Sequence, residues 1–243
     1  MKSLKCLLLA SLLFSCLSTV VSAQQLPDLP TKPTPKFENP SFCPPEGNVA
    51  SHGDPELNQN KNRIDSPSQF FPVGSSEIQT LPFPQSAGGK LESDWTASER
   101  KAIEKSEGIP ITVEGFLAIV NNAHQGEPPL MQGARPEGKE SCNCNSIKPK
   151  EIDFHLWLLP GAADSRKKAI VVEMTPRVRK NHPGWTVAKL TTIAKNKTPV
   201  RVSGWLMFDG QHPEQIMKTR ATLWEIHPII QVQFKQGNTW KTL

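Results

Sequence analysis

The stretch PVRVSGWLMFDGQHPEQIMKTRATLWEIHPIIQVQF, residues 199–234, decides the predicted fold. Two runs typical of β-strands, 200–208 and 222–234, flank a polar loop. The loop is rich in ionisable side chains: Asp209, His212, Glu214, Lys218 and Arg220. A closing pair of strands of this kind favours a small barrel, provided that the chain upstream supplies the remaining strands.

Three upstream runs have the alternation expected of strands, at 111–120, 151–159 and 169–176. A helix is predicted over 182–196, opened by His-Pro-Gly-Trp. The order β-β-β-α-β-β over about 135 residues is that of the oligonucleotide/oligosaccharide-binding barrel, the OB-fold. We therefore predict an all-β domain with one helix, a five-stranded OB-like barrel over 109–243. The alternative is a helix packed on an open antiparallel sheet.

The alternation also predicts which side chains fill the barrel. The expected core consists of Val113, Leu117, Phe154, Leu156, Val172, Met174, Val202, Leu206, Phe208, Trp224 and Ile226. Gly115 interrupts the first strand, where a small barrel needs a bend or bulge.

The N-terminal part of the chain has a different composition. Residues 1–23 have the pattern of a signal peptide, with Lys2 and Lys5 before a short apolar run and Val-Ser-Ala at its end. They predict export to the periplasm or the extracellular space. A lipoprotein signal ending at Cys16 is the weaker alternative, because Phe14 fits that motif badly.

Residues 24–92 are predicted to form a disordered leader, because 12 of the 23 prolines fall within 24–90 and few apolar residues are spaced to build a core. The leader could still lie on the domain. A short helix is predicted within 93–108, with Asp94 or Thr96 as N-cap, Glu99 completing a capping box and Gly108 ending it.

Removal of residues 1–23 would leave three cysteines, Cys43, Cys142 and Cys144. The Cys-Asn-Cys spacing is too tight for an unstrained bridge between Cys142 and Cys144. The sequence therefore predicts a bridge from Cys43 to one of them with a spare thiol, a metal site, or an intermolecular bond.

The charge is uneven along the chain. Residues 24–108 carry 8 Lys/Arg and 12 Asp/Glu, whereas residues 109–243 carry 18 and 11. A basic domain suits an anionic polymer such as nucleic acid or acidic polysaccharide, although ordinary colloidal charge gives the same balance.

The predicted ligand platform is the outer face of the second and third strands, which binds polymers in OB-folds. Trp157 and His155 would stack on the ligand, and cations would neutralise it. The binding residues predicted beside these two are Arg166, Lys167, Lys168, Arg177, Arg179, His212 and Arg220. The competing interpretation is that Trp157 packs under the leader or the long loop of 121–150.

Two other functional classes remain open. One alternative is a zinc site, for example that of a hydrolase, formed by Cys142, Cys144, Asp153 and His155, since thiolate and imidazole suit zinc. A catalytic interpretation would pair His155 or His227 with Glu173 or Glu225. Because the chain has no nucleophile elbow and no glycine-rich phosphate loop, we assign no catalytic residue and expect no cofactor other than this zinc. A structural envelope protein that docks on a protein partner is the third hypothesis.

Four segments carry a resemblance: ESCNC (140–144), DFHLWL (153–158), GWLMFD with HPEQI (204–216) and RATLWEIHP (220–228). They resemble a group of exported bacterial proteins with an OB-like domain, over roughly residues 110–234. The resemblance implies the barrel and export, and it implies no catalytic residue. The arginine-and-carboxylate pattern of the staphylococcal-nuclease family, which shares this barrel, is not found.

Overall fold

The computed structural model of the protein describes residues 26–27, 32–51, 53–121 and 131–243. The predicted signal peptide, the lipoprotein motif and part of the long loop lie outside these residues. No helix in the described part of the chain is both long and apolar enough to cross a membrane.

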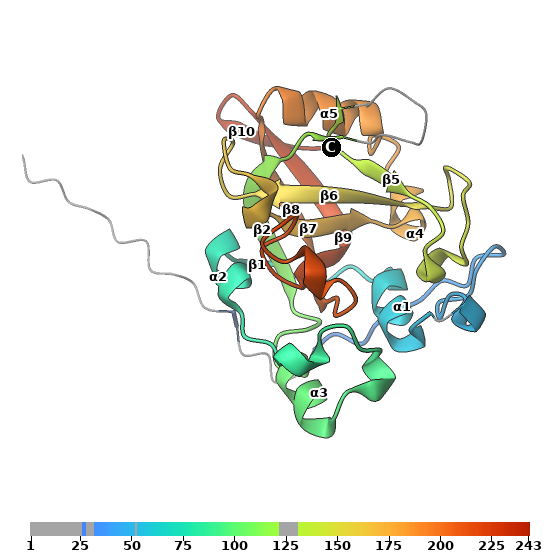
Figure 1. The fold of residues 1–243 in the computed structure, drawn as a ribbon. Coiled ribbons are helices and arrows are strands. Elements are labelled where there is room, and N and C mark those ends of the chain that lie inside the picture. Colours follow the sequence, from blue (N-terminus) through green and yellow to red (C-terminus); the bar gives the residue numbers. More distant parts are fainter. Residues whose placement is uncertain (1–25, 28–31, 52, 122–130) are drawn as a thin grey trace, which may run out of the picture.

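The centre of the molecule is a closed barrel of five strands (Figure 1). They are β2 (Pro110–Leu117), β6 (Asp153–Leu159), β7 (Ile170–Met174), β8 (Pro199–Phe208) and β9 (Trp224–Gln236). The neighbour order is β2-β8-β9-β7-β6, and pairing of β2 with β6 closes the ring. The β7–β9 pair is parallel and the other four pairs are antiparallel. This connectivity confirms the predicted OB-like barrel.

All eleven residues of the predicted core are buried. They lie on alternate positions of the five strands, so that one face of each strand points into the barrel. The apolar alternation was therefore sufficient to predict both the strands and the side that each strand turns inward.

Two glycines permit the close backbone contacts that the barrel needs. Gly115 lies where β2 passes from β8 to β6, and a Cβ atom there would be 2.5 Å from the carbonyl oxygen of Leu159. At Gly204 the β8–β9 register shifts, and a Cβ would be 2.3 Å from the carbonyl oxygen of Pro228. Only glycine fits such approaches. The β2–β8 register continues through Gly115 without a shift, so the role of this glycine is the close approach to β6.

The predicted helices are present with shifted bounds. Helix α3 (Ala97–Glu104) begins at the predicted N-cap Thr96, whose hydroxyl accepts from the Glu99 backbone N–H in a capping box. Helix α5 (Val187–Lys195) lies across one end of the barrel and begins later than predicted, with Thr186 as its N-cap. Residues 182–186 form a turn instead, and the four-residue helix α4 (Pro176–Arg179) follows β7.

The N-terminal segment differs from the disordered leader that we predicted. Between residues 49 and 94 it forms short elements: η1 (Val49–Ser51), α1 (Pro55–Asn62), β1 (Phe71–Pro72), α2 (Ser75–Thr80), η2 (Gln85–Ala87) and η3 (Glu92–Asp94). Strand β1 pairs in parallel with β2, and Leu57 and Ile78 are buried. Prolines keep these elements short, and contacts with the barrel hold them in place. This agrees with the alternative that the leader lies on the domain.

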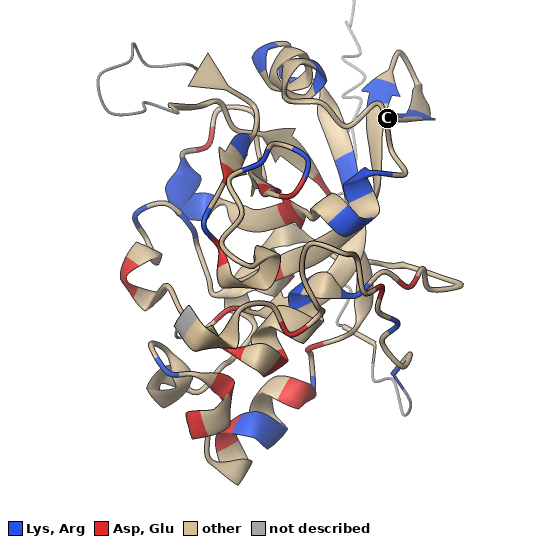
Figure 2. Cartoon of the chain, turned by 90° about the vertical axis from the view of Figure 1, so that its right-hand side faces the viewer, with Lys and Arg blue, Asp and Glu red and all other residues tan. Residues whose placement is uncertain are grey.

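Short elements complete the molecule. A hairpin of β3 (Val120–Asn121) and β4 (Met131–Gln132) follows β2, and β5 (Arg135–Glu137) pairs with β6. Single turns η4 (Ser141–Asn143), η5 (Arg166–Lys168) and η6 (Pro213–Gln215) lie in the loops, and β10 (Thr239–Thr242) pairs with β9. Acidic residues gather in the lower part of the molecule, around α3 (Figure 2).

Candidate functional site

A polar cavity of about 360 Å³ lies on the outer face of β6 and β7. Its walls come from three covering segments: α1, the loop that leads from β5 to η4, and the loop after β8. The lining consists of Lys61, Arg135, Glu137, Gly138, Lys139, Glu140, His155, Trp157, Val171, Glu173, Asp209, His212, Gln215 and Arg220. In an OB-fold this face, between the loops after the first and fourth strands, is where ligands bind.

Two buried ion pairs brace the walls of the cavity. Lys61 Nζ of α1 lies 3.0 Å from Asp209 Oδ2, and Arg220 Nη2 lies 2.9 Å from Glu225 Oε2. Arg220 also donates through Nε to the carbonyl oxygen of Thr222. Because the charges of Lys61 and Arg220 are already neutralised by carboxylates of the protein, these two residues stabilise the walls and contribute little charge to the binding of a ligand.

Two imidazoles and three carboxylates meet at and directly beneath the floor. His155 Nε2 lies 3.1 Å from both Glu140 Oε1 and Glu173 Oε2. His227 Nδ1 lies 3.2 Å from the same Glu173 oxygen and 3.3 Å from Glu225 Oε1. Glu173 Oε2 has no hydrogen bond of acceptable geometry despite these two neighbours. The Oε2 atom of Glu173 therefore lies between two imidazole rings but forms a well-oriented hydrogen bond with neither.

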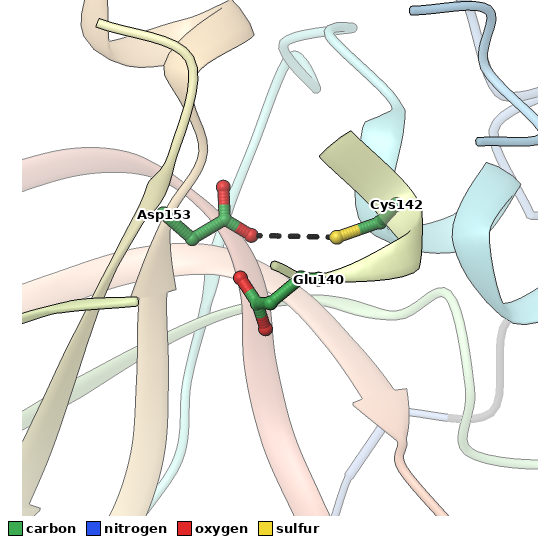
Figure 3. Close-up of side chains that lie close together, drawn as sticks. All are labelled: Glu140, Cys142 and Asp153. Carbon is green, nitrogen blue, oxygen red and sulfur yellow. Dashed lines mark hydrogen bonds between the residues drawn. The ribbon is translucent and has the colours of Figure 1, made fainter. Parts of the chain in front are cut away.

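A third group lies directly beside the floor, where Cys142 and Glu140 from the η4 turn face Asp153 at the start of β6 (Figure 3). The Cys142 Sγ–H donates to Asp153 Oδ2 at 3.7 Å and accepts from Asn143 Nδ2 at 3.5 Å. The neighbouring Cys144 forms a disulfide with Cys43, which ties the turn to the N-terminal segment.

Burial and mutual charge shift the pKa values of the floor strongly. For His155, burial acts against the charged form, but Glu173 and Glu140 outweigh it and raise the pKa to about 10. Burial raises the pKa of Glu173 to about 7, and burial together with Glu140 raises the pKa of Asp153 to about 6. Burial also raises the pKa of the Cys142 thiol well above its ordinary value. The carboxylates thus keep the pKa of His155 high, and the pKa of Glu140 is lowered to about 2 by His155 although burial acts against it.

The structure brings together four of the nine predicted binding residues. His155, Trp157, His212 and Arg220 all line the cavity. Trp157 is only 6% exposed and lies in a small apolar cluster with the Arg166 guanidinium 5.1 Å from its ring centroid. It is therefore not an open stacking platform. Its apolar neighbours, Ala118, Val120, Leu159, Ala169 and Val171, lie on or beside the barrel strands and belong neither to the predicted leader nor to the loop of 121–150.

The remaining predicted cations lie elsewhere. Arg177 is buried and donates to the carbonyl oxygens of Cys43 and Pro44. Arg179 donates to the carbonyl oxygen of Ile152 and lies 3.9 Å over the Phe154 ring. Both arginines hold chain segments in place, contrary to their predicted place at the rim. Lys167 and Lys168 are exposed on η5 at the tip of the β6–β7 hairpin, where Lys168 pairs with Asp164.

The predicted zinc set needs a correction. Cys144 is in the disulfide with Cys43 and cannot act as a thiolate ligand, whereas Cys142 is a free, buried thiol. The predicted bridge from Cys43 is confirmed, with Cys144 as its partner. Cys142, Asp153 and His155 remain, and they lie among other possible ligands that the spacing did not indicate.

Sequence reasoning missed Lys61, Glu140 and three charged residues of the rim, Arg135, Glu137 and Lys139. Lys61 belongs to the proline-rich segment of residues 24–92, which we predicted to be disordered. Glu140 is part of the ESCNC segment, two positions before Cys142, and that position was the only available signal.

Comparison of the chain with protein-family models, with curated proteins and with solved structures gave no match.

Proposed function

We propose that this protein binds an anionic group, phosphate or carboxylate, in the cavity over β6 and β7, as the terminal or side group of a nucleic acid or an acidic glycan. The observation that supports this is the coincidence of an enclosed, polar cavity with the ligand face of an OB barrel. A cavity of about 360 Å³ accommodates one such group, not a polymer lying along a flat surface.

The cations of the cavity favour an anion. Lys139 is exposed on its rim, as is Arg135, whose Nε also lies 2.7 Å from Glu137 Oε2. A larger cavity of about 610 Å³ lies beside β1 and β2, but its lining carries a single ion pair, Arg201 with Glu114. The smaller cavity is therefore the better candidate, because it combines charge, enclosure and position.

The test is a titration with matched pairs of ligands at several salt concentrations. The pairs are oligonucleotides with and without a terminal phosphate, and uronic-acid oligosaccharides with their neutral reduced forms. We expect only the acidic member of one pair to bind. The salt dependence should be shallow, because one group is neutralised, whereas a strand bound along its backbone gives a steep one.

The rim cations provide the matching variants. Arg135→Gln with Lys139→Gln should weaken binding about tenfold, since each exposed charge contributes up to about 1 kcal/mol. Lys195→Gln, on the exposed side of α5, is the control and should leave the affinity unchanged. Equal binding of the acidic and neutral ligands, or an unaltered affinity in the rim variant, would contradict the proposal.

A further inference from the structure

We infer that Glu140, His155 and Glu173 bind a divalent transition-metal cation of the zinc class at the floor of the cavity. Each of the three offers one possible ligand atom, and these atoms lie within 4.8 Å of one another. An imidazole nitrogen with carboxylate oxygens is a common donor set for such cations, with metal–ligand bonds of about 2.0–2.2 Å.

The geometry of the three residues fits one cation. His155 Nε2 lies 3.1 Å from an oxygen of each glutamate. Ligands bonded at about 2.1 Å around a tetrahedral ion lie about 3.4 Å apart, so small side-chain shifts would suffice to bind it. All three side chains also line the cavity, which gives a cation a route in from solvent.

Buried carboxylate oxygens that form no hydrogen bond are a second, independent observation that points to a cation here. Glu173 is 2% exposed, and its Oε2 has no hydrogen-bond partner. The Oε2 atom of Glu140 is also buried and without one. Buried carboxylate oxygens are costly unless they are paired or bind a cation. Glu173 Oε2 lies 3.1 Å from His155 Nε2, and the other oxygen of Glu140, Oε1, lies 3.1 Å from the same nitrogen.

A second layer of residues holds the three in place. His227 contacts the Glu173 carboxylate through Nδ1, Glu225 contacts that same nitrogen, and Arg220 pairs with Glu225. On the other side, the Cys43–Cys144 disulfide fixes the turn that carries Glu140. Such outer layers orient metal ligands and commonly change metal affinity by about 10–100-fold when they are altered.

Cys142 does not need to be a ligand. Its thiol is satisfied, since it donates to Asp153 and accepts from Asn143. Three protein ligands leave a coordination position free toward the cavity, as in zinc sites that bind a further molecule. An anionic ligand group would occupy it, and this last step alone rests on the function proposed above.

The test is calorimetric titration of Zn²⁺ into the whole protein after chelator treatment, without thiol reductants and without any organic ligand. We expect one equivalent to bind and the thermal unfolding midpoint to rise with zinc. Because no anion is present, the result stands or falls independently of anion binding. Absence of a stoichiometric zinc site in the folded wild type would overturn the inference.

Variants assign the ligands. Glu140→Gln and His155→Gln should each weaken zinc binding at least about tenfold. The controls Glu151→Gln and His182→Gln replace the same residue types away from the cavity and should bind as the wild type does. Circular dichroism establishes that each variant is folded. If His155→Gln destabilises the fold, Glu140→Gln alone decides the matter, and wild-type zinc affinity in that variant would refute the assignment.

Discussion

At the scale of single residues, two buried acids show how neighbours decide whether a charge persists. Asp209 is 2% exposed, and although burial acts against its charge, Lys61 and Arg220 outweigh it and hold its pKa well below the usual range. Glu92 is 3% exposed, but burial and the nearby Glu107 carboxylate raise its pKa to about 9. At neutral pH the folded protein therefore keeps Asp209 charged and Glu92 protonated.

The protonated Glu92 makes stability depend on pH. The unfolded chain releases this proton near its ordinary pKa of 4.5, whereas the folded chain retains it to about 9. The free energy of unfolding should thus fall as pH rises through this window, by at most about 1.4 kcal/mol per pH unit from this group. Glu92→Gln removes that dependence, so its advantage over the wild type should grow with pH.

Urea unfolding at pH 5.5, 7.0 and 8.5 measures the difference. Glu104→Gln, an exposed glutamate on α3, is the control and should follow the wild-type curve at all three pH values. Parallel curves for Glu92→Gln and the wild type would show that Glu92 is ionised in the folded state.

At the scale of elements, the η4 turn is the piece that the disulfide positions. It carries Glu140 and Cys142 to the cavity, and Cys144 at its end bridges to Cys43, 101 positions away in the sequence. Asn62 of α1 also donates to the Cys142 carbonyl oxygen at 2.8 Å. Since a bridge across so long a separation strongly restricts the unfolded chain, we expect it to contribute to stability as well as to local geometry.

Removal of this disulfide gives a specific outcome. Replacing both Cys43 and Cys144 with Ser should lower the free energy of unfolding by about 2–5 kcal/mol. Reductant should destabilise the wild type by a similar amount and leave the double variant unchanged. Urea unfolding with and without reductant checks this, and a wild type that is fully reduced yet equally stable would contradict it.

Elements also show what the sequence could predict and what it could not. The five strands were predictable because their apolar residues alternate, so burial of Leu156 or Val202 follows from local pattern alone. The short helices before residue 95 were not, because α1 and α2 are too short to be stable without the contacts that hold them.

The site was predictable only in part, for a related reason. Asp153, His155 and Glu173 could be assigned to one outer face by counting along the strands. Their burial could not, because outer faces of barrels are normally wet and the covering segments come from distant parts of the chain. Likewise, the sequence around Arg177 does not indicate whether its side chain lies at the rim or, as in the structure, donates a hydrogen bond to the Cys43 carbonyl oxygen.

At the scale of the whole molecule, the N-terminal segment and the barrel form one packed unit. Trp205 of β8 donates through Nε1 to the carbonyl oxygen of Asp65, and the Arg63 guanidinium lies 3.5 Å over the Trp205 ring. Lys61 reaches the barrel loop at Asp209, 148 positions away. Because these contacts lie in the interior, we expect segment and barrel to unfold together.

The Lys61–Asp209 ion pair tests that expectation. Lys61→Met leaves the buried Asp209 carboxylate without its nearest cation, which should cost about 3–5 kcal/mol. Adding Asp209→Asn should recover part of the loss, whereas Lys90→Met, at a surface pair in the same segment, should cost at most about 1 kcal/mol. Urea unfolding followed by tryptophan fluorescence and by protease cleavage of the segment should give coincident transitions. Cleavage of the segment before the fluorescence changes would mean that it opens on its own, and that the cavity it covers is exposed while the barrel stays folded.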